Sequence, residues 1–207
     1  MARLQRVFID TSELFPFTIM DVLLTLSEDL LFTWVWTDDV LDEWEHVIVR
    51  EGQRSPQSAK SVTDAVRTHF GRHRIDGDLY DGKITEDLSP DPGDRNHAAA
   101  CVYGDVDVLV TRNVKHYRSP RLTDAGVEVV TADAFLCALL VRHPSDVLGS
   151  VVNAAARRRN PPTTFTGFVE RLERAGATQF AHLLLDADRR RRRAVADELS
   201  AGTDGFS

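Results

Sequence analysis

Cysteines are few in this sequence, and long apolar runs are missing. Among the 207 residues there are two cysteines, Cys101 and Cys137, each within an apolar segment. This is typical of buried thiols in a reducing compartment, so we expect no disulfide. No apolar run reaches the about 18 residues that a membrane span needs, and acidic residues interrupt the first thirty residues, where a signal peptide would need an apolar core. We therefore expect a cytoplasmic protein with no membrane partner.

Charge is unevenly distributed along the chain. Hydrophobic residues make up 43% of the sequence, which is enough for a substantial core, and the formal net charge is −7. Residues 1–143 contain 15 Lys and Arg against 24 Asp and Glu, whereas residues 144–207 contain 10 against 8. We therefore look for a metal site in the acidic first part, while any contact with nucleic acid has to come from local groups of basic residues.

Apolar periodicity predicts strands that alternate with helices. Short apolar runs of strand character occupy residues 6–10, 31–36, 106–111 and 127–130. Helical spacing and capping residues predict helices at residues 16–31, 38–48, 56–70, 92–104 and 134–141. Short, nearly all-apolar strands separated by helices are typical of a parallel sheet covered on both faces, so the predicted fold class is α/β.

The alternation of strands and helices ends at His143-Pro144. Beyond this point only helices are predicted, at residues 145–159, 164–175 and 177–199, and the chain ends in the polar segment AGTDGFS. We therefore predict an α/β domain over residues 1–143, a helical extension over residues 144–199 and a flexible tail over residues 200–207.

Several acidic and polar residues stand at ends of predicted strands or starts of predicted helices. Asp10 ends the first strand, and Asp94 lies in the first turn of the helix before the third strand. Thr111-Arg112-Asn113 ends the third strand, and Glu43 lies on the helix after the second. Such positions converge on one crevice in an open parallel sheet. Carboxylates gathered there repel one another unless a cation neutralises them; oxygen ligands favour Mg²⁺ or Mn²⁺, which can activate a water for phosphodiester hydrolysis.

Each of these acids also has a purely structural interpretation. Asp10 could cap the next helix, and Asp91-Pro92-Gly93-Asp94 has the pattern of a capping box, which alone would explain Asp94. Glu43 and Glu45 lie about equally far from the apolar stripe of their helix, so periodicity does not choose between them.

Five segments of the chain resemble a known family in their order and spacing. They are VFIDTSEL, WTDDVLDEWEHVI, DPGDRNHAAAC, DVLVTRNVKHY and GVEVVTADAFL, and PPTTFTGFVERLERAGATQFAHLL follows downstream. The chain resembles PIN-domain ribonucleases of the VapC-like toxin group, in the longer form with a helical extension. The resemblance implies a PIN-like, Rossmann-type three-layer fold with a central parallel sheet. It also implies an Mg²⁺- or Mn²⁺-dependent nuclease that acts on RNA and is inhibited by a cognate antitoxin protein; a homodimer is possible.

Carried over to this sequence, the resemblance assigns roles to individual residues. Asp10, Glu43 and Asp94 become the metal ligands, which selects Glu43 over Glu45. The hydroxyls of Thr11, Ser12 and Thr111 become supporting groups that orient a carboxylate or a bound water.

The sequence departs from the family pattern at three positions. Asn113, the fourth catalytic position, and His116 stand where many relatives carry acids, so one negative charge is missing, although an amide oxygen still binds Mg²⁺ or a ligand water. His97, one helical turn after Asp94, stands where an aliphatic residue is usual, and we favour a packed core histidine over the alternative of a catalytic role.

Basic residues near the predicted site are the candidates for RNA phosphate. Arg95 and Arg112 are close to it in sequence. Five consecutive arginines at residues 189–193 point around the whole circumference of a helix and have acidic neighbours, so we favour a solvated helix over a phosphate contact, and we treat residues 157–159 in the same way.

Other functional classes stay open. The missing fourth acid would also suit a catalytically weak PIN-like binding module whose acidic crevice recognises a partner. A Rossmann-type nucleotide binder is poorly supported because DTSELF, not a Gly-rich turn, follows the first strand. A phospho-accepting receiver domain would lack a convincing lysine after the last strand.

Overall fold

The structure is a computed structural model that describes the backbone of residues 3–158 and 162–203 and the side chains of residues 3–158 and 162–197. The chain divides into two compact units, residues 1–132 and residues 133–207. Each unit is described by itself. The domain limits predicted from the sequence, including the limit after residue 143, stay a prediction.

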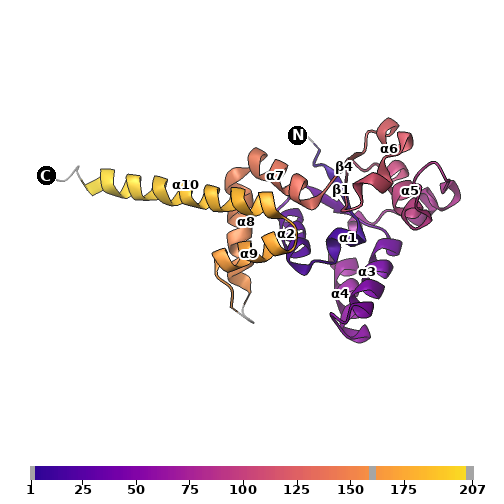
Figure 1. Ribbon diagram of the computed structural model, residues 1–207, viewed down its shortest axis with the longest axis horizontal. Helices are drawn as coiled ribbons and strands as arrows, with labels where there is room; N and C mark the ends of the chain where they lie inside the picture. Colours follow the sequence, from indigo (N-terminus) through magenta and orange to yellow (C-terminus); the bar gives the residue numbers. More distant parts are fainter. Residues whose placement is uncertain (1–2, 159–161, 204–207) are drawn as a thin grey trace. The chain divides into compact units, whose positions relative to one another are not determined.

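The first unit is built on a four-stranded parallel sheet (Figure 1). Its strands are β1 (Arg6–Ile9), β2 (Thr33–Val35), β3 (Val108–Val110) and β4 (Glu128–Val130), and their order is β2-β1-β3-β4. In the register, Phe8 pairs with Val35 on one side and with Leu109 on the other. The two central strands, β1 and β3, are almost completely buried, because helices cover both faces of a parallel sheet. The predicted α/β fold is confirmed.

Helices and short 3₁₀ turns connect the strands. Thr37 and Ser55 accept hydrogen bonds from the first turns of the helices that follow them, as their positions in the sequence predict. The helices of this unit are α1 (Thr11–Leu14), α2 (Phe17–Glu28), α3 (Asp38–Arg50), α4 (Pro56–His69), α5 (Arg95–Tyr103) and α6 (Pro120–Asp124), and α7 (Ala132–Arg142) starts at its end. The 3₁₀ turns are η1 (Gly71–His73), η2 (Gly77–Leu79), η3 (Asp81–Lys83), η4 (Pro92–Asp94) and η5 (Val114–Tyr117).

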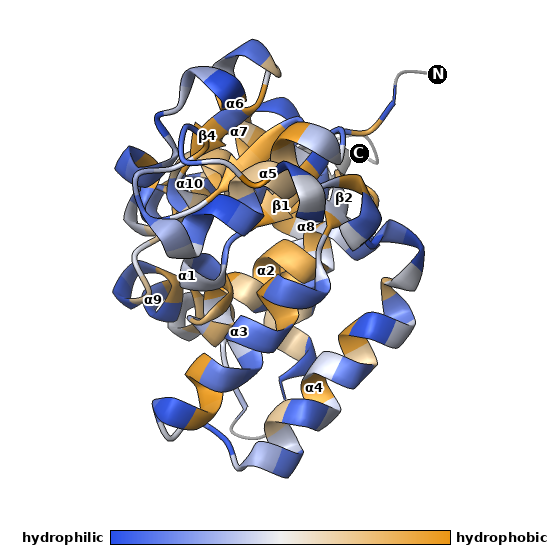
Figure 2. Ribbon diagram, turned by 90° about the vertical axis from the view of Figure 1, so that its right-hand side faces the viewer, coloured by the Kyte–Doolittle hydropathy of each residue, from blue (hydrophilic) through white to orange (hydrophobic). Residues whose placement is uncertain are grey.

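The core of the first unit lies along the sheet. Apolar residues follow the strands and the inner faces of the helices, and the ribbon is orange along β1 and much of α2 (Figure 2). Large aromatic side chains fill the space between sheet and helices: Trp34, Trp36 and Trp44 are at most 1% exposed. Because α3 contacts both α1 and α5, the segments that lead into these two helices lie beside it.

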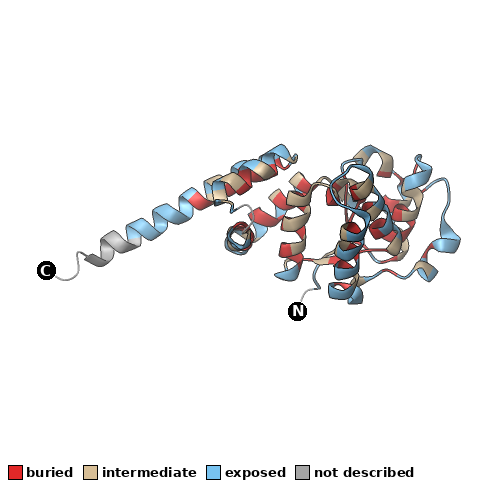
Figure 3. Cartoon of the chain, turned by 90° about the horizontal axis from the view of Figure 1, so that it is seen from below, coloured by how far each residue is buried: buried red, intermediate tan, exposed pale blue. Residues whose placement is uncertain are grey.

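The second unit is helical in its described residues. It contains α7 from Asp133 onward, α8 (Pro144–Arg157), α9 (Phe165–Arg174) and α10 (Thr178–Thr203). The last three of these helices contact one another and bury Phe168, Leu172, Phe180 and Leu184. Residues 189–197 of α10 are exposed (Figure 3). Its backbone stays helical to Thr203, and the last four residues of the predicted tail lie outside the described residues. Among the described residues, no helix combines the length and the apolar character that a membrane crossing requires.

Candidate active site

The first acid, Asp10, lies at the carboxyl edge of the sheet. Its backbone N–H donates to the carbonyl of Val110 at 2.9 Å, so the pairing of β1 with β3 continues one residue beyond the strand and brings Asp10 next to Thr111. Oδ2 of Asp10 accepts hydrogen bonds from Thr111 Oγ1 at 2.8 Å and from Ser12 Oγ at 2.5 Å. These contacts hold one oxygen of a carboxylate that is 4% exposed.

The surroundings of Asp10 keep it ionised. Burial by itself would raise the pKa of the carboxyl, but His97, Ser12 and Thr111 outweigh burial, and the pKa lies below its ordinary value. Asp10 is the N-cap residue of α1, yet its side chain makes no capping hydrogen bond. Capping therefore does not explain this acid.

The second acid, Asp94, is likewise not used as a cap. Asp91 caps η4 by accepting a hydrogen bond from the backbone N–H of Gly93 at 2.9 Å. Asp94 stands at the N-cap position of α5 without a side-chain capping bond, and its Oδ2 lies 2.9 Å from Nδ1 of His116. The capping-box pattern thus accounts for Asp91 and leaves Asp94 free for another role.

The structure separates the two glutamates that periodicity does not distinguish. Glu45 accepts a hydrogen bond from Thr63 Oγ1 at 2.6 Å and so faces α4. Glu43 lies on the side of α3 that faces α5, where its Oε2 is 3.5 Å from Nε2 of His97. Half of the Glu43 side chain remains exposed.

One cavity of about 340 Å³ brings these predicted residues together. All of the predicted metal ligands and both hydroxyl residues after Asp10 line it, as do Arg112 and Asn113. Thr11 Oγ1 is buried and has no hydrogen-bond partner among the described residues. Thr111 is fully buried and supports Asp10 from behind. The complete lining is Asp10, Thr11, Ser12, Phe15, Pro16, Glu43, Val47, Arg50, Glu51, Asp94, Arg112 and Asn113.

The two predicted phosphate candidates occupy different places. Arg112 lines the cavity, and its Nε lies 3.1 Å from Oε2 of the buried Glu13. Arg95 does not line it: its Nε donates to the carbonyl of Ser89 at 3.1 Å. Arg50, at the end of α3, lines the cavity although the sequence analysis did not select it. Only its place in the fold identifies it.

His97 is a member of the site that the sequence analysis interpreted as core packing. Its ring is 3% exposed, with Nδ1 3.3 Å from Oδ1 of Asp10 and Nε2 3.5 Å from Oε2 of Glu43. Burial alone would lower the pKa of His97, but the polar contact with Asp10 and the charges of Asp10, Glu43 and Asp94 outweigh burial and raise the pKa. The available signal was its position one helical turn after Asp94, on the same face of α5.

The donor groups at and beside the cavity fit a divalent cation, although His97, Asp91 and His116 are not among the residues that line the cavity. Ligand atoms of Asp10, Asp94 and His97 lie within 4.8 Å of one another, and so do those of Asp91, Asp94 and His116. Two buried or half-buried carboxylates in one such cluster need a compensating positive charge. Carboxylate oxygens are the protein ligands that Mg²⁺ and Mn²⁺ favour.

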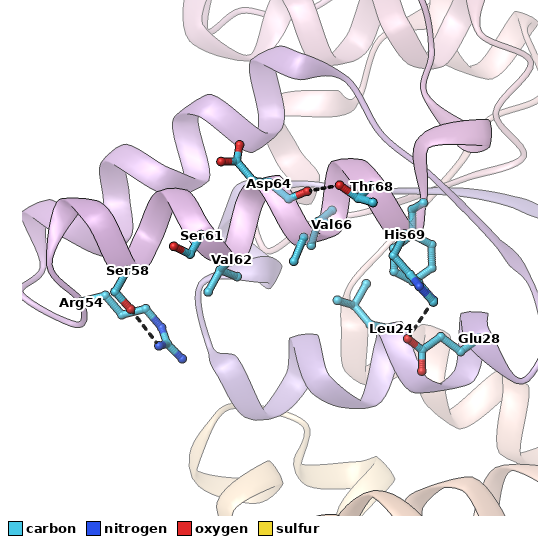
Figure 4. A pocket seen from close by; sticks show the side chains of 12 residues that line it. Leu24, Glu28, Arg54, Ser58, Ser61, Val62, Asp64, Val66, Thr68 and His69 are labelled. Atoms are coloured by element: carbon cyan, nitrogen blue, oxygen red, sulfur yellow. Dashed lines mark hydrogen bonds and ion pairs between the residues drawn. The ribbon is translucent and has the colours of Figure 1, made fainter.

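A second, larger groove lies between α2 and α4 (Figure 4). Leu24, Val62 and Val66 give it an apolar floor, and an ion pair of 3.3 Å between His69 and Glu28 lies at one end. The described residues that line it include none of the predicted site residues. The predicted metal ligands therefore line the crevice at the sheet edge and not this groove.

The arginines of the second unit are largely paired or stacked. Asp188 lies within 2.9 Å of Arg191 and 2.6 Å of Arg192, which confirms that acidic neighbours pair with the run at residues 189–193. Arg158 lies over the ring of Phe168, and residue 159, which the sequence analysis grouped with it, is outside the described residues. These contacts favour a solvated helix.

The fold and the crevice define a class of protein: a parallel α/β domain with acidic side chains gathered at the carboxyl edge of its sheet. The family model described as PIN domain matches residues 6–115, more than half of the chain, and a second model, VapC50 C-terminal domain, matches residues 132–186. The chain therefore belongs to the PIN domain family, and the two matches in this order are those of a VapC-like PIN toxin with a C-terminal extension. No curated protein and no solved structure matches the chain.

Proposed function

We propose that this protein is a metal-dependent endoribonuclease, which hydrolyses phosphodiester bonds of RNA and acts as the toxin of a toxin–antitoxin pair. The observation that carries the proposal is that Asp10, Glu43 and Asp94, from three separate segments, line one cavity at the sheet edge. Neither aspartate is used as a helix cap, so capping does not account for their position. Membership of the PIN family makes a toxin-associated nuclease the expected class.

The residues of the crevice divide the work of hydrolysis between them. Asp10, Glu43 and Asp94 would hold the cation, and the hydroxyls of Ser12 and Thr111 fix the orientation of Asp10 through its Oδ2. When bound, Mg²⁺ or Mn²⁺ lowers the pKa of a coordinated water and neutralises charge on the attacked phosphate. The neutral amide of Asn113 lines the cavity and offers an oxygen to a ligand water.

Basic side chains at the rim would hold the RNA. Arg112 and Arg50 both line the cavity, so a phosphate bound to the cation would lie within their reach. RNA as the substrate and a cognate antitoxin as the partner are parts of the same proposal and rest on the family rather than on the geometry. A cytoplasmic location, which rests on the composition of the sequence, and a homodimer belong to the proposal as well.

The direct test is cleavage of a labelled RNA by the purified chain, freed of any antitoxin. We expect cleavage with Mg²⁺ or Mn²⁺, none with EDTA, and loss of activity in Asp10→Ala and Asp94→Asn. Glu45→Gln is the matched control, because this acid bonds to Thr63 and not to the crevice. Undiminished cleavage by both aspartate variants would place the activity elsewhere or in a contaminating nuclease.

Because the fourth acid is missing, we also consider a second function, that of a catalytically weak binding module. If the crevice is a working metal site, Asn113→Asp adds a negative charge at almost the same size and should tighten Mg²⁺ binding, whereas Asn113→Ala should not. Calorimetric titration of Mg²⁺ into the unaltered chain, Asn113→Asp and Asn113→Ala measures the three affinities directly. If none of the three binds a divalent cation, the binding module is the better description.

A further inference from the structure

The metal cluster of the crevice contains an imidazole where the predicted site has a third carboxylate. The ligand atoms that lie within 4.8 Å of one another belong to Asp10, Asp94 and His97, and Glu43 is not among them. The His97 side chain is 4% exposed, whereas that of Glu43 is 51% exposed. The buried position beside the two aspartates is therefore held by a nitrogen donor.

The nitrogen that faces Asp10 has the placement of a ligand. Nδ1 of His97 lies 3.3 Å from Oδ1 of Asp10, which is close enough for a polar contact, but its alignment does not meet the geometry of a hydrogen bond, and this buried nitrogen has no hydrogen-bond partner among the described residues. A donor that points at an oxygen makes a hydrogen bond, whereas two ligands of one ion point at the ion and stand side by side. Neighbouring ligands at about 2.1 Å from an octahedral ion are about 3 Å apart, close to the spacing seen here.

The other ring nitrogen has the partner that a metal-bound histidine usually has. Histidine ligands commonly donate their second N–H to a carboxylate, which fixes the tautomer and the ring orientation. Nε2 of His97 lies 3.5 Å from Oε2 of Glu43. Glu43 then acts as a positioning residue for His97.

A second histidine near Asp94 does not have this arrangement. Nδ1 of His116 lies 2.9 Å from Oδ2 of Asp94, which is hydrogen-bond distance, and its side chain is 35% exposed. A nitrogen that shares a proton with Asp94 supports that carboxylate and has no lone pair directed at an ion. His116 is therefore a matched control for His97.

We propose that His97 Nδ1 is a direct ligand of the catalytic cation, together with Asp10 and Asp94, and that this nitrogen makes the site prefer Mn²⁺ to Mg²⁺. The inference rests on the proposed function, since it concerns the cation of the same crevice. Both ions favour oxygen ligands, but Mg²⁺ is bound almost entirely by oxygen, whereas Mn²⁺, a transition-metal ion, also accepts an imidazole nitrogen. The structure thus assigns the role predicted for Glu43 to a residue on α5.

The test reads the coordination itself and does not depend on activity. Mn²⁺ is bound to the metal-free full-length chain, and pulsed electron paramagnetic resonance detects any nitrogen nucleus coupled to the ion. We expect a ¹⁴N coupling that becomes a ¹⁵N coupling when the chain is grown with ¹⁵N-histidine. It should disappear in His97→Gln and persist in His116→Gln and in Glu43→Gln.

Calorimetry supplies the second readout. His97→Gln should lower the affinity for Mn²⁺ by at least about tenfold and should change the affinity for Mg²⁺ much less. Loss of a residue that only supports a ligand already lowers metal affinity about 10–100-fold, so loss of a ligand should cost at least as much. If His97→Gln does not fold, the ¹⁵N-histidine experiment on the unaltered chain and on His116→Gln still tests the inference. Neither protein carries a change at position 97.

Three outcomes would overturn the inference. They are bound Mn²⁺ without nitrogen coupling, coupling that is lost in His116→Gln instead of His97→Gln, and equal loss of Mg²⁺ and Mn²⁺ affinity in His97→Gln. With any of them, RNA cleavage that depends on Asp10 would leave the proposed function standing. Conversely, nitrogen coupling in a chain that cleaves no RNA would support the site and refute the nuclease.

Discussion

The replacement Thr111→Val tests whether the hydroxyl at the sheet edge orients Asp10 for metal binding. Valine has nearly the same shape as threonine and suits a strand end, so the change removes a hydroxyl without opening a cavity. Thr111 is fully buried, and its Oγ1 donates to Oδ2 of Asp10 at 2.8 Å and accepts from the backbone N–H of Asn113 at 3.1 Å. The carboxylate would keep only Ser12 as a hydroxyl donor on that oxygen.

The expected magnitude follows from the charge and burial of the acceptor. A hydrogen bond to an ionised group contributes about 1.5–3 kcal/mol to stability, and the buried position of Asp10 limits replacement by water. We therefore expect Thr111→Val to lower the free energy of unfolding by about 1.5–3 kcal/mol in urea denaturation at neutral pH. Because Asp10 also loses a fixed orientation, affinity for Mn²⁺ and the rate of RNA cleavage should fall about 10–100-fold.

A second threonine provides the control. Thr63 is also fully buried and donates to a carboxylate, Oε2 of Glu45, at 2.6 Å, but this pair lies outside the crevice. Thr63→Val should lower stability and leave Mn²⁺ affinity and cleavage unchanged. If Thr111→Val and Thr63→Val lose the same stability and neither loses metal affinity, the hydroxyl of Thr111 does not prepare a metal ligand, and our account of the sheet edge is wrong.

Three further predictions test the other contacts of the site. Glu43→Gln should reduce RNA cleavage, because its carboxylate faces His97, while Glu45→Gln should only reduce stability; cleavage rates and urea denaturation separate the two. Arg50→Ala should raise KM for RNA and Arg95→Ala should not, since only Arg50 lines the cavity; equal KM values would contradict this. Burial raises the pKa of Glu13 above its ordinary 4.5. The contribution of Glu13 to the free energy of unfolding is therefore present below pH 4.5 and is lost as the pH rises through the raised pKa. The free energy of unfolding of Glu13→Gln, measured from about pH 4 to 8, should not show this decrease.

Much of the fold was predictable because its signals are local. Strands that are buried on both faces must be apolar along their whole length, and the runs around β1 and β3 show this directly. Thr37 and Ser55 mark helix starts through hydrogen bonds to residues three positions on. The four-residue helix α1 escaped prediction, since so short an element carries no periodicity.

The candidate site was predictable to the extent that topology alone positions a residue. Asp10 follows a central parallel strand and Asp94 precedes a helix, so both were expected at the carboxyl edge of the sheet, where the structure brings them together. The sequence could not show whether these acids cap helices. An acid that caps a helix and an acid that is free to bind a cation can occupy the same N-cap position, and only their side-chain contacts differ.

The sequence by itself determined the α/β class, the strand ends and the hydroxyl of Ser12 beside Asp10, because each depends on neighbours within a few positions along the chain. The pairing of β1 with β3 brought the hydroxyl of Thr111 to Asp10. The packing of helices decided the rest. It turned Glu43 toward α5 and Glu45 toward α4, moved Arg95 away from the crevice that Arg112 and Arg50 line, and placed His97 against Asp10. These outcomes depend on how α3 contacts α1, α4 and α5, and contacts between distant segments are set by the shape and burial of whole helices rather than by any local pattern.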